Sequence, residues 1–567
     1  MVDPSPGDAS SRAEVVVIGG GHNGLVCAAY LARAGVDVLV LERNSRCGGA
    51  LFSTTTDGFT FEHGAVDHST IIGSTIPDEL QLDRHGLEYV YRTASALHVY
   101  GDGVQIAIGE SAEDTARSIA EVDAADAEAW LELVALSGRL LALTGELSRD
   151  PPVPMEAAQR LGSAALGRAG RPILELARSS AVDVAERWFR SAHLRALAIF
   201  RSQFSGLPPW YPGTGAVFCL TPAGHGRRFG RPRGGSRAFV DALQSAVVGL
   251  GGRVRCDFPV GRVSREGGGW RIESSASSGS DSVVATRAIV SAVPPQDVVL
   301  RLLDADVVPA AVRRRFERVE VVSGNLSQFT LAAALRRPPP LDHLRPGFAG
   351  SQLWLLAEPS CALENAAAAL AGALATRPGV LLTFPSLLDP TAAPEGAATA
   401  WINGFVAHRL AAEGGWRQGA EVVSRGVWRT VESCLPGVHE LVADSVFTSS
   451  EDLTRRTGAV NAGAHVSTII TQLLAGRPVR GSADHRSGIA GIYLTGAGTN
   501  PGPSISGLPG RACAEVILAD LAARGSGRAR RPVSTVRREA ARWRRLSELA
   551  LATRRDAGGV GGQPPAG

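Results

Sequence analysis

Apolar and polar positions follow two different periods along the chain, which indicates a protein that mixes strands with helices. The first apolar run, residues 14–18 (EVVVI), predicts a short buried strand. Residues 24–34 place apolar side chains at helical spacing, and residues 36–41 (VDVLVL) predict a second strand. This order is typical of a parallel sheet with crossover helices. We therefore expect an α/β fold that opens with a β-α-β unit.

The strand pattern returns much later in the chain. Residues 114–147 are rich in Ala, Glu and Leu and predict a helical stretch, whereas residues 254–274 and 288–293 predict short strands. Residues 492–495 predict another strand, followed by a helix over residues 510–523. A chain of 567 residues has room for roughly two to four domains.

The composition is that of a folded globular protein, with 44% apolar and 20% charged residues. Lysine is absent, so all 58 basic residues are Arg. This excludes a P-loop lysine, a Schiff-base lysine and a lysine that anchors pyridoxal phosphate.

The spacing of cysteine and histidine argues against metal and disulfide chemistry. The seven cysteines form no CxxC pair, and the histidines form no HxxxH or HExxH pair. We therefore predict no metal site, no redox-active cysteine pair and a reducing, cytoplasmic location. The polar N-terminus lacks the apolar core of a signal peptide, and no apolar stretch is long enough to span a membrane.

The C-terminal end differs in charge from the rest of the chain. From Arg524 onward there are 11 Arg and three acidic residues, a net charge of +8, whereas the whole chain has a formal charge of +3. Val536, Ala540 and Trp543 recur at helical spacing among these arginines. The pattern fits a basic amphipathic helix in peripheral contact with an anionic membrane, or a solvated terminus. No nucleic-acid recognition motif accompanies the arginines, so we predict no nucleic-acid partner.

A glycine-rich motif directly follows the first predicted strand and opens the helix after it. Gly19 permits the tight turn, Gly21 lets the backbone approach a pyrophosphate, and Gly24 lets the helix pack closely on the strand. The free N–H groups and the dipole of the helix then bind phosphates. An acid ends the second strand, where a carboxylate accepts hydrogen bonds from ribose hydroxyls. The residues that this dinucleotide-binding pattern selects are Gly19, Gly21, His22, Asn23, Gly24 and Glu42.

The residues after this motif distinguish FAD from NAD. The run Glu42–Gly49 (ERNSRCGG) adds a glycine pair after the acid, and it resembles the glutathione-reductase-2 type of FAD-binding fingerprint that amine oxidases and phytoene desaturases share. Residues 58–64 (GFTFEHG) resemble the segment that follows in these proteins. The resemblance adds Arg43, Gly48 and Gly49 to the expected FAD-binding residues. The sequence has no second motif of this kind for a nicotinamide cofactor.

Further segments resemble the phytoene desaturase-like branch of this family. Residues 232–235 (PRGG) match a motif that precedes a helix, and residues 254–263 look like the strand pair in which the Val260 backbone meets the adenine. Residues 385–396 resemble the motif PSxxDPxxAPxG. Residues 494–511 resemble the C-terminal flavin motif LxGxGTHPGGGxSGxxGR. This last motif adds to the expected FAD-binding residues Gly496, Gly498, Ser506 and Gly507.

The resemblance implies an α/β fold with a doubly wound, Rossmann-like FAD-binding domain and an interleaved α+β substrate domain. The FAD-binding domain is expected to consist of residues 1–70, 230–300 and 485–525. The substrate domain is expected to consist of residues 71–229 and 301–484, and the basic tail, residues 526–567, to be separate.

The chain departs from the family pattern at three places near the expected flavin. Asn500 stands where the family usually has His, residues 502–504 replace a glycine run, and Ala50 stands where many relatives have Arg. The candidates for catalytic residues are Asp67, His68 and Asn500, with a structural role preferred for the first two.

Residues 202–226 contain no Asp, Glu or Arg and are broken by Pro and Gly. Such a segment can line an apolar substrate tunnel or dip into a bilayer surface. The simpler interpretation is an ordinary buried loop.

The resemblance implies an FAD-dependent oxidoreductase that moves a hydride between flavin and a lipophilic, polyene substrate, with desaturation as the leading reaction. Its electron partner is oxygen, a quinone or NAD(P)H. One alternative is a reductive cyclase or isomerase of a polyene natural product in secondary metabolism, such as a polycyclic tetramate macrolactam precursor. Another is a non-catalytic prenyl carrier of the GDP-dissociation-inhibitor type. The intact phosphate glycines and Glu42 argue against the carrier.

Overall fold

The computed structural model describes residues 11–92, 96–149, 170–225, 229–276, 281–319, 325–459, 478–479 and 482–525. The chain divides into two units, Met1–Glu515 and Val516–Gly567. Both large sheets and the candidate site lie in the first unit. The basic tail, residues 526–567, lies outside the described residues, so its amphipathic helix stays a prediction.

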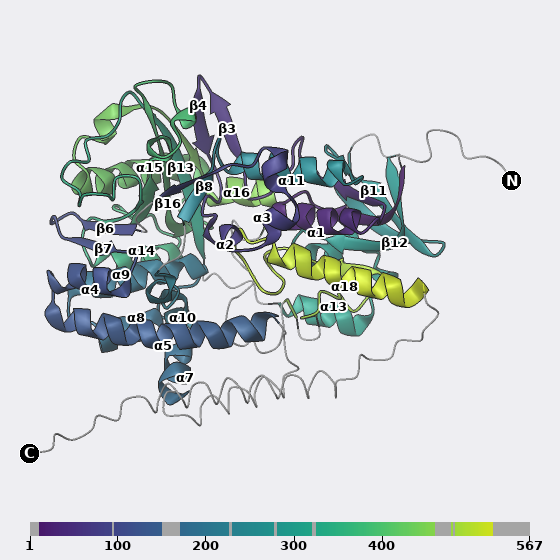
Figure 1. The fold of residues 1–567 in the computed structure, drawn as a ribbon, viewed down its shortest axis with the longest axis horizontal. Coiled ribbons are helices and arrows are strands. Elements are labelled where there is room, and N and C mark those ends of the chain that lie inside the picture. The colour runs from purple at the N-terminus through teal and green to yellow at the C-terminus, as the bar shows by residue number, and fades with distance from the viewer. Residues whose placement is uncertain are drawn as a thin grey trace, which may run out of the picture. The chain divides into compact units, whose positions relative to one another are not determined.

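The expected β-α-β unit lies in a seven-stranded sheet (Figure 1). Its strands are β1 (Arg12–Ile18), β2 (Val38–Leu41), β9 (Arg253–Arg255), β10 (Val260–Glu266), β11 (Gly269–Ser274), β12 (Ser282–Ser291) and β18 (Ile492–Leu494). Their order is β10-β11-β12-β1-β2-β9, and β18 pairs with the C-terminal end of β12. Strands β9, β2, β1, β12 and β18 are parallel, whereas β10, β11 and β12 form an antiparallel meander.

Burial on both faces explains why the first strands are continuous apolar runs. Val15, Val16 and Val17 of β1 are fully buried, and so is every residue of β2. Each such side chain contributes roughly 1.5–3 kcal/mol of hydrophobic free energy. Helix α1 (His22–Arg33), buried from Asn23 to Ala32, connects the two strands, which pair in parallel register. The predicted β-α-β unit is therefore confirmed, with the second strand two residues shorter than expected.

A second seven-stranded sheet is mixed and mostly antiparallel. Its order is β17 (Val442–Thr448), β13 (Leu326–Leu335), β16 (Ala398–Ala407), β15 (Val380–Thr383), β14 (Gln352–Leu356), β6 (Ala96–Tyr100) and β7 (Gln105–Ile108). Only the β14–β6 pair in it is parallel. Two small pairs complete the described strands: β3 (Ser53–Thr56) with β4 (Phe59–Glu62), and β5 (Tyr89–Arg92) with β8 (Phe229–Pro232).

Helices flank both sheets (Figure 1). Helix α1 contacts β1, β2 and α11 (Ser236–Gly249), whereas α15 (Gly415–Cys434) contacts β6, β14, β15 and β17. The remaining α-helices are α2 (Ser69–Ile72), α3 (Ile76–Glu79), α4 (Ala112–Ala120), α5 (Ala124–Arg149), α7 (Gly170–Arg178), α8 (Ala181–Trp188), α9 (Ala192–Ser202), α10 (Thr214–Phe218), α12 (Pro295–Asp297), α13 (Ala310–Glu317), α14 (Cys361–Leu370), α16 (Ser450–Thr457) and α18 (Leu508–Gly525). Short 3-10 or π turns are Leu82–His85, Gln203–Ser205, Pro222–Gly224, Val298–Leu302, Ala305–Val307, Pro385–Leu387, Pro390–Ala392 and His439–Leu441.

The stretch 114–147, expected to be helical, contains two helices rather than one. The break falls at Asp123, whose Oδ1 accepts hydrogen bonds from the N–H groups of Ala125 (2.8 Å) and Asp126 (3.0 Å). An Asp that binds backbone N–H groups in this way starts a new helix. Sequence periodicity missed the break because both helices are apolar on one face.

The described part of the segment 202–226 is mostly buried. Gln203, Leu207 and Phe218 are each at most 2% exposed, and Phe218 packs edge-on against Trp130 and Phe189. These contacts are those of a packed loop with one short helix, α10.

No described helix combines the length and the apolar character needed to cross a bilayer. The first sheet is assembled from strands in residues 12–41, 253–291 and 492–494, and the second from residues 96–108 and 326–448. The exact division into an FAD-binding and a substrate domain stays a prediction.

Candidate functional site

The loop between β1 and α1 contains the three glycines of the motif. Gly19 has a φ of +105°, in the region that favours glycine, and its N–H donates to the Leu41 carbonyl at 2.8 Å. A Cβ at Gly24 would lie 2.2 Å from the carbonyl oxygen of Gly19, so only glycine fits there. A Cβ at Gly21 would meet only the Cα of Gly49, 3.9 Å away. The fold thus needs glycine at positions 19 and 24. At position 21 the missing side chain instead leaves free space beside the loop.

The first backbone N–H groups of α1 have no hydrogen-bond acceptor within their own helix. Gly21 is the N-cap, no side chain caps it, and the first turn contains no acidic residue. The first N–H groups of a helix carry partial positive charge and bind phosphate oxygens readily. An open glycine beside an uncapped helix start is what a pyrophosphate requires.

Glu42 follows β2 and is 4% exposed. Its Oε2 accepts a hydrogen bond from the N–H of Gly20 at 2.8 Å. Its Oε1 accepts from the backbone N–H and the side-chain amide of Asn44, at 2.9 and 2.6 Å. Because a carboxylate has about four acceptor positions, lone pairs remain for the hydroxyls of a ribose. These bonds fix the carboxylate beside the loop of residues 19–24, which we call the phosphate loop.

Val260 lies at the start of β10, half-buried, on a chain segment that is tied to Glu42. The N–H of Glu42 donates to the Arg255 carbonyl, and the N–H of Phe258 donates to the Glu42 carbonyl, both at 2.9 Å. The proposed ribose-binding acid and the proposed adenine-binding strand therefore lie together.

The second glycine pair packs directly on the first motif. Gly48 forms a bridge with Gly21, and its N–H donates to the Gly20 carbonyl at 2.9 Å. Gly48 and Gly49 have φ values of +143° and +59°. Arg43, in contrast, donates from Nη2 to the carbonyls of Arg455 (2.6 Å) and Arg456 (2.5 Å) at the end of α16. The backbone of the fingerprint thus faces the phosphate loop, while its arginine caps a helix.

The C-terminal motif, almost 500 residues away in sequence, meets the start of α1. The His22 Nε2 lies 3.2 Å from the Ser504 carbonyl oxygen. Burial lowers the pKa of His22 to about 4, although this contact opposes the shift. A Cβ at Gly510 would lie 2.2 Å from the Asn23 carbonyl oxygen. Ser504 also donates from Oγ to Thr70 Oγ1 at 2.7 Å. The two distant stretches therefore converge.

The rest of the C-terminal motif forms a compact turn between β18 and α18. Gly496 has a φ of +102°, and its carbonyl accepts from the N–H and hydroxyl of Thr499, at 3.0 and 2.9 Å. Gly498 is buried. The Asn500 amide is buried too and donates to the Ala483 carbonyl at 3.0 Å. The last pair, Gly507 and Ser506, starts α18: Gly507 has a φ of +67°, and Ser506 Oγ accepts from the Leu508 N–H at 3.3 Å.

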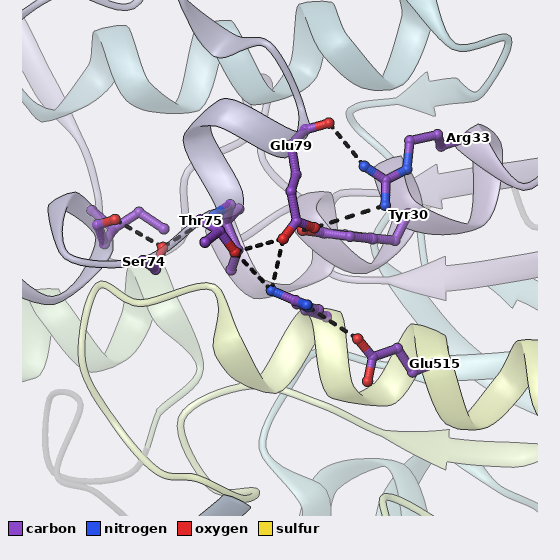
Figure 2. A network of polar contacts seen from close by, with 9 residues as sticks. Tyr30, Arg33, Ser74, Thr75, Glu79 and Glu515 are labelled. Atoms are coloured by element: carbon purple, nitrogen blue, oxygen red, sulfur yellow. Dashed lines mark hydrogen bonds and ion pairs between the residues drawn. The ribbon is translucent and has the colours of Figure 1, made fainter.

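Arg511, the last residue of this motif, contacts Tyr30 of α1 and Glu79 of α3. Figure 2 shows the polar network around Glu79. Arg511 contacts Glu79 Oε1 and Glu515 Oε1, each at 3.0 Å. The second Glu79 oxygen accepts from the Tyr30 hydroxyl at 2.6 Å, and the Glu79 carbonyl accepts from Arg33 at 2.8 Å. The network holds the C-terminal motif against the helix that starts at the phosphate loop.

The arrangement fits FAD. Gly21 leaves space at an uncapped helix start, the buried Glu42 carboxylate lies next to it, and the C-terminal turn closes on the same helix end. One continuous region contains the residues expected to bind FAD from the first part of the chain, which are Gly19, Gly21, His22, Asn23, Gly24, Glu42, Gly48, Gly49 and Val260. The turn residues of the C-terminal motif belong to the same region; these are Gly496, Gly498, Ser506 and Gly507. The individual roles of these residues stay predictions.

The motif segments outside the phosphate loop contact each other. Glu62 Oε1 accepts from the Ser236 N–H at 2.7 Å at the start of α11, and a Cβ at Gly235 would lie 2.7 Å from the same oxygen. Burial raises the pKa of Glu62, opposed by Arg231 and by this hydrogen bond. The segment 58–64 thus anchors the PRGG turn.

Residues 385–396 complete this cluster. The Gly234 N–H donates to Asp389 Oδ2 at 2.6 Å, and a Cβ at Gly58 would lie 3.1 Å from Pro394. The three motifs that follow the fingerprint therefore hold one another in place, which their sequence positions did not reveal.

Asp67 and His68 have different environments. Asp67 is exposed. Desolvation opposes its ionisation, but the charge of Arg92 and hydrogen bonds from Ser69 and Gln352 leave the Asp67 pKa below its usual value. Burial lowers the pKa of His68 to about 3. Its Nδ1 lies 3.1 Å from the hydroxyl of Tyr89. Asp67 is therefore ionised at neutral pH and His68 is neutral and packed.

Three arginines near Asp67 were not predicted from the sequence. Arg92 ends β5 and Arg231 lies in β8, the strand that pairs with it, while Arg201 lies in α9. Each has a buried nitrogen without a hydrogen-bond partner: Nε of Arg92, Nη2 of Arg201 and Nη1 of Arg231. Isolated arginines in an arginine-rich chain carry no local signal, so only the fold identifies them.

Comparison with known proteins agrees with this geometry. Residues 17–69 match the family model described as an NAD(P)-binding Rossmann-like domain. Over 551 residues the chain is 27% identical to pyridine nucleotide-disulfide oxidoreductase domain-containing protein 2 of Rattus norvegicus, covering 90% of this chain and 94% of the relative. It is 25% identical to one of the subunits of limonene dehydrogenase from Castellaniella defragrans, covering 90% and 95%. It is also 25% identical to the lycopene-forming phytoene desaturase of Pseudescherichia vulneris, covering 90% and 99%.

The chain is a phytoene desaturase-like, FAD-dependent oxidoreductase. The fold of this oxidoreductase is also that of a solved putrescine oxidase variant, with a TM-score of 0.60 at 17% identity, covering 90% of this chain and 99% of the other. The predicted family, the Rossmann-like α/β fold and the FAD cofactor are thereby confirmed.

Proposed function

We propose that this oxidoreductase removes hydrogen from a lipophilic, unsaturated substrate. The observation that supports the proposal most is similarity over nine-tenths of the chain to proteins named as a phytoene desaturase and as part of a limonene dehydrogenase. Phytoene and limonene are both unsaturated hydrocarbons, so a substrate with allylic C–H bonds follows.

FAD would supply the redox step by accepting a hydride from a C–H bond. The phosphate loop and the uncapped start of α1 would hold its pyrophosphate, and Glu42 its ribose. Among the candidate residues, Asp67 is ionised at neutral pH because its pKa is lowered, so it would accept the proton that leaves the substrate. His68 is buried and neutral and would position Tyr89 instead.

The number of dinucleotide motifs in the sequence limits how the reduced flavin would be reoxidised. The chain has one such glycine-rich motif, so oxygen, a quinone or NAD(P)H from solution would reoxidise the flavin. A basic C-terminal tail on an anionic membrane would bring the site close to lipophilic substrates and quinones.

A single anaerobic turnover tests the proposal. Purified protein should be yellow, and oxidised flavin should bleach when phytoene or limonene in detergent is added. Mass spectrometry should then find a product lacking two hydrogens. Bleached flavin that reoxidises on adding a polyene, with a hydrogenated or cyclised product, would favour the reductive alternative. A colourless protein that extracts prenyl lipids would favour the carrier and contradict the proposal.

A further inference from the structure

The C-terminal end of α16 lies against the FAD fingerprint. Arg43 donates from Nη2 to the carbonyls of Arg455 and Arg456, at 2.6 and 2.5 Å. A Cβ at Gly458, the residue after this helix, would lie 3.6 Å from Arg43 Nη1. A cation is favourable at this place because the last carbonyl groups of a helix carry partial negative charge. Arg43 thereby fixes the backbone of Arg456 beside the fingerprint.

The side chain of Arg456 packs on the segment that follows the glycine pair. Its guanidinium lies over the ring of Phe52, 4.3 Å from the centre, and Phe52 stacks on His63 with 5.4 Å between the ring centres. Burial and the charge of Arg456 lower the pKa of His63, so this histidine is neutral at pH 7. A cation is attracted to the face of an aromatic ring. The ring therefore holds the guanidinium in one place.

The backbone of residues 50–52 continues the pairing of β3 with β4. The carbonyls of Phe52 and Ala50 accept from backbone N–H groups that follow β4, at 3.1 and 2.9 Å. Because side chains alternate between the two faces of an extended chain, those at positions 50 and 52 share one face, and the buried Leu51 lies on the other. Ala50 is exposed, and it stands where many relatives have Arg. The Arg456 guanidinium thus lies on the face to which a side chain at position 50 points.

Arg456 has hydrogen-bond donors that the protein does not satisfy. Its Nε is buried without a partner. Among the described residues no carboxylate forms an ion pair with it, whereas the neighbouring Arg455 pairs with Asp452 at 2.8 Å. Residues 460–477, which follow along the chain, contain no Asp or Glu. A buried donor without an acceptor costs free energy, so an acceptor from outside the protein would be bound there.

The charges around Arg456 are otherwise engaged. Burial lowers the pKa of Arg456; the charge of Glu42 opposes this shift, and the charges of Arg237 and Arg43 add to it. Glu42 accepts from backbone and amide N–H groups, Arg237 pairs with Asp241 at 3.0 Å, and Arg43 donates to the end of α16. Arg456 is therefore the cation of this group that has no partner of its own.

We propose that Arg456 binds the pyrophosphate of FAD, so that the end of α16 supplies the guanidinium that many relatives have at position 50. The glycine pair connects Phe52 to the phosphate loop, because a Cβ at Gly49 would lie only 3.2 Å from the Cα of Gly21. A planar guanidinium binds phosphate oxygens with two parallel hydrogen bonds. The inference concerns the cofactor, so it does not depend on which substrate the enzyme oxidises.

Release of FAD from the loaded full chain tests the proposal without substrate. The flavin that stays with the chain is measured by absorbance at intervals after dilution and desalting. Arg456→Met should release FAD about tenfold or more faster than the native protein, because one charge-assisted contact is lost. Arg456→Lys should lie between the two, since it keeps the charge but not the planar donor pair. Release from Arg456→Met at the native rate would overturn the proposal.

Fragments of FAD locate the contact. ADP-ribose contains the adenosine and the pyrophosphate without the flavin, and adenosine contains no phosphate. Each fragment competes with FAD for the deflavinated full chain, and its inhibition constant is measured. Arg456→Met should weaken ADP-ribose binding about tenfold or more and leave adenosine binding unchanged. Unchanged binding of ADP-ribose, or an equal loss for both fragments, would overturn the assignment to the pyrophosphate.

A second substitution and a control separate binding from a structural role. Ala50→Arg added to Arg456→Met should slow FAD release again, because it returns a guanidinium to the same exposed face. Release from the double variant as fast as from Arg456→Met would contradict the proposal. Arg455→Met is the matched control: its side chain is exposed and paired with Asp452, so FAD release should keep the native rate.

The stability of each variant is measured by chemical denaturation. If Arg456→Met does not fold, Arg456→Lys replaces it in the same comparison, and release from Arg456→Lys at the native rate would then overturn the proposal. No step of these experiments uses a substrate. Their outcome is therefore distinct from that of the anaerobic turnover that tests the proposed dehydrogenation.

Discussion

The phosphate loop and the cavity between Asp67, Arg92 and Arg231 both present hydrogen-bond donors, but they do so with different groups. At the phosphate loop the donors are backbone N–H groups at the start of α1, and the neighbouring side chain is the carboxylate of Glu42. At the cavity the donors are the side chains of Arg92 and Arg231 on two paired strands. Backbone donors need glycine at fixed spacing, whereas side-chain donors need only that distant strands meet.

This difference decides what a substitution does at each place. At the phosphate loop, a Cβ on Gly24 would clash with backbone, whereas a Cβ on Gly21 would occupy space expected for the cofactor. Substitutions at these two positions should therefore affect stability and cofactor binding separately. At the cavity, removing a guanidinium also removes the free-energy cost of burying a cation whose nitrogens are not all paired.

The largest effect is expected from Gly24→Ala. The new Cβ would lie 2.2 Å from the Gly19 carbonyl oxygen, which is backbone and cannot rotate away. We expect the free energy of unfolding to fall by about 1–3 kcal/mol or more, measured by chemical denaturation. Gly21→Val is the matched control for flavin binding, since the position is open in the protein: it should fold and lose FAD. Full FAD occupancy in Gly21→Val would contradict the phosphate-loop assignment.

Glu42→Ala should have the next largest effect. It leaves the buried N–H of Gly20 without its acceptor, at a cost of about 1–3 kcal/mol, and removes the ribose partner. We expect FAD to be lost during gel filtration, measured as flavin absorbance per chain. Glu42→Gln keeps one oxygen acceptor and should retain more flavin. Equal retention in both variants and the native protein would show that this acid does not contact the cofactor.

His68 should make stability depend on pH. Burial lowers its folded pKa to about 3, so on acidification the unfolded chain binds a proton from about pH 6.5 and the folded chain does not. The free energy of unfolding should therefore fall between pH 6.5 and 5.5, with this group contributing roughly 1 kcal/mol. The comparison is His68→Phe, whose pH slope should be flatter. Identical slopes would place the His68 pKa near its ordinary value.

The smallest effect is expected in the surface network of Figure 2. Glu79 and Arg511 have side chains about one-third exposed, and ion pairs of this kind contribute roughly 0–1 kcal/mol. A double-mutant cycle with Glu79→Gln and Arg511→Gln should give a coupling within that range by thermal denaturation. Coupling well above it would mean that docking of α18 depends on this pair.

Much of the fold was predictable because its signals are local. The apolar runs 14–18 and 36–41 are continuous since both faces of their sheet are buried, and the glycine motif lies between them. The break between α4 and α5 was missed because a capping Asp123 does not interrupt the apolar pattern. Arg43 was expected at the cofactor, and the structure shows its side chain on the end of α16.

The sequence by itself determined the α/β class through the period of its apolar residues. It determined the dinucleotide loop through glycines at fixed spacing, and it indicated FAD through resemblance to a known fingerprint. The tertiary structure alone decided which distant segments meet: Ser504 beside His22, Asp389 beside Gly234, and Arg92 beside Arg231 around one cavity. Such contacts depend on strand pairing over more than a hundred residues, and side chains that meet in this way leave no periodic trace in the chain.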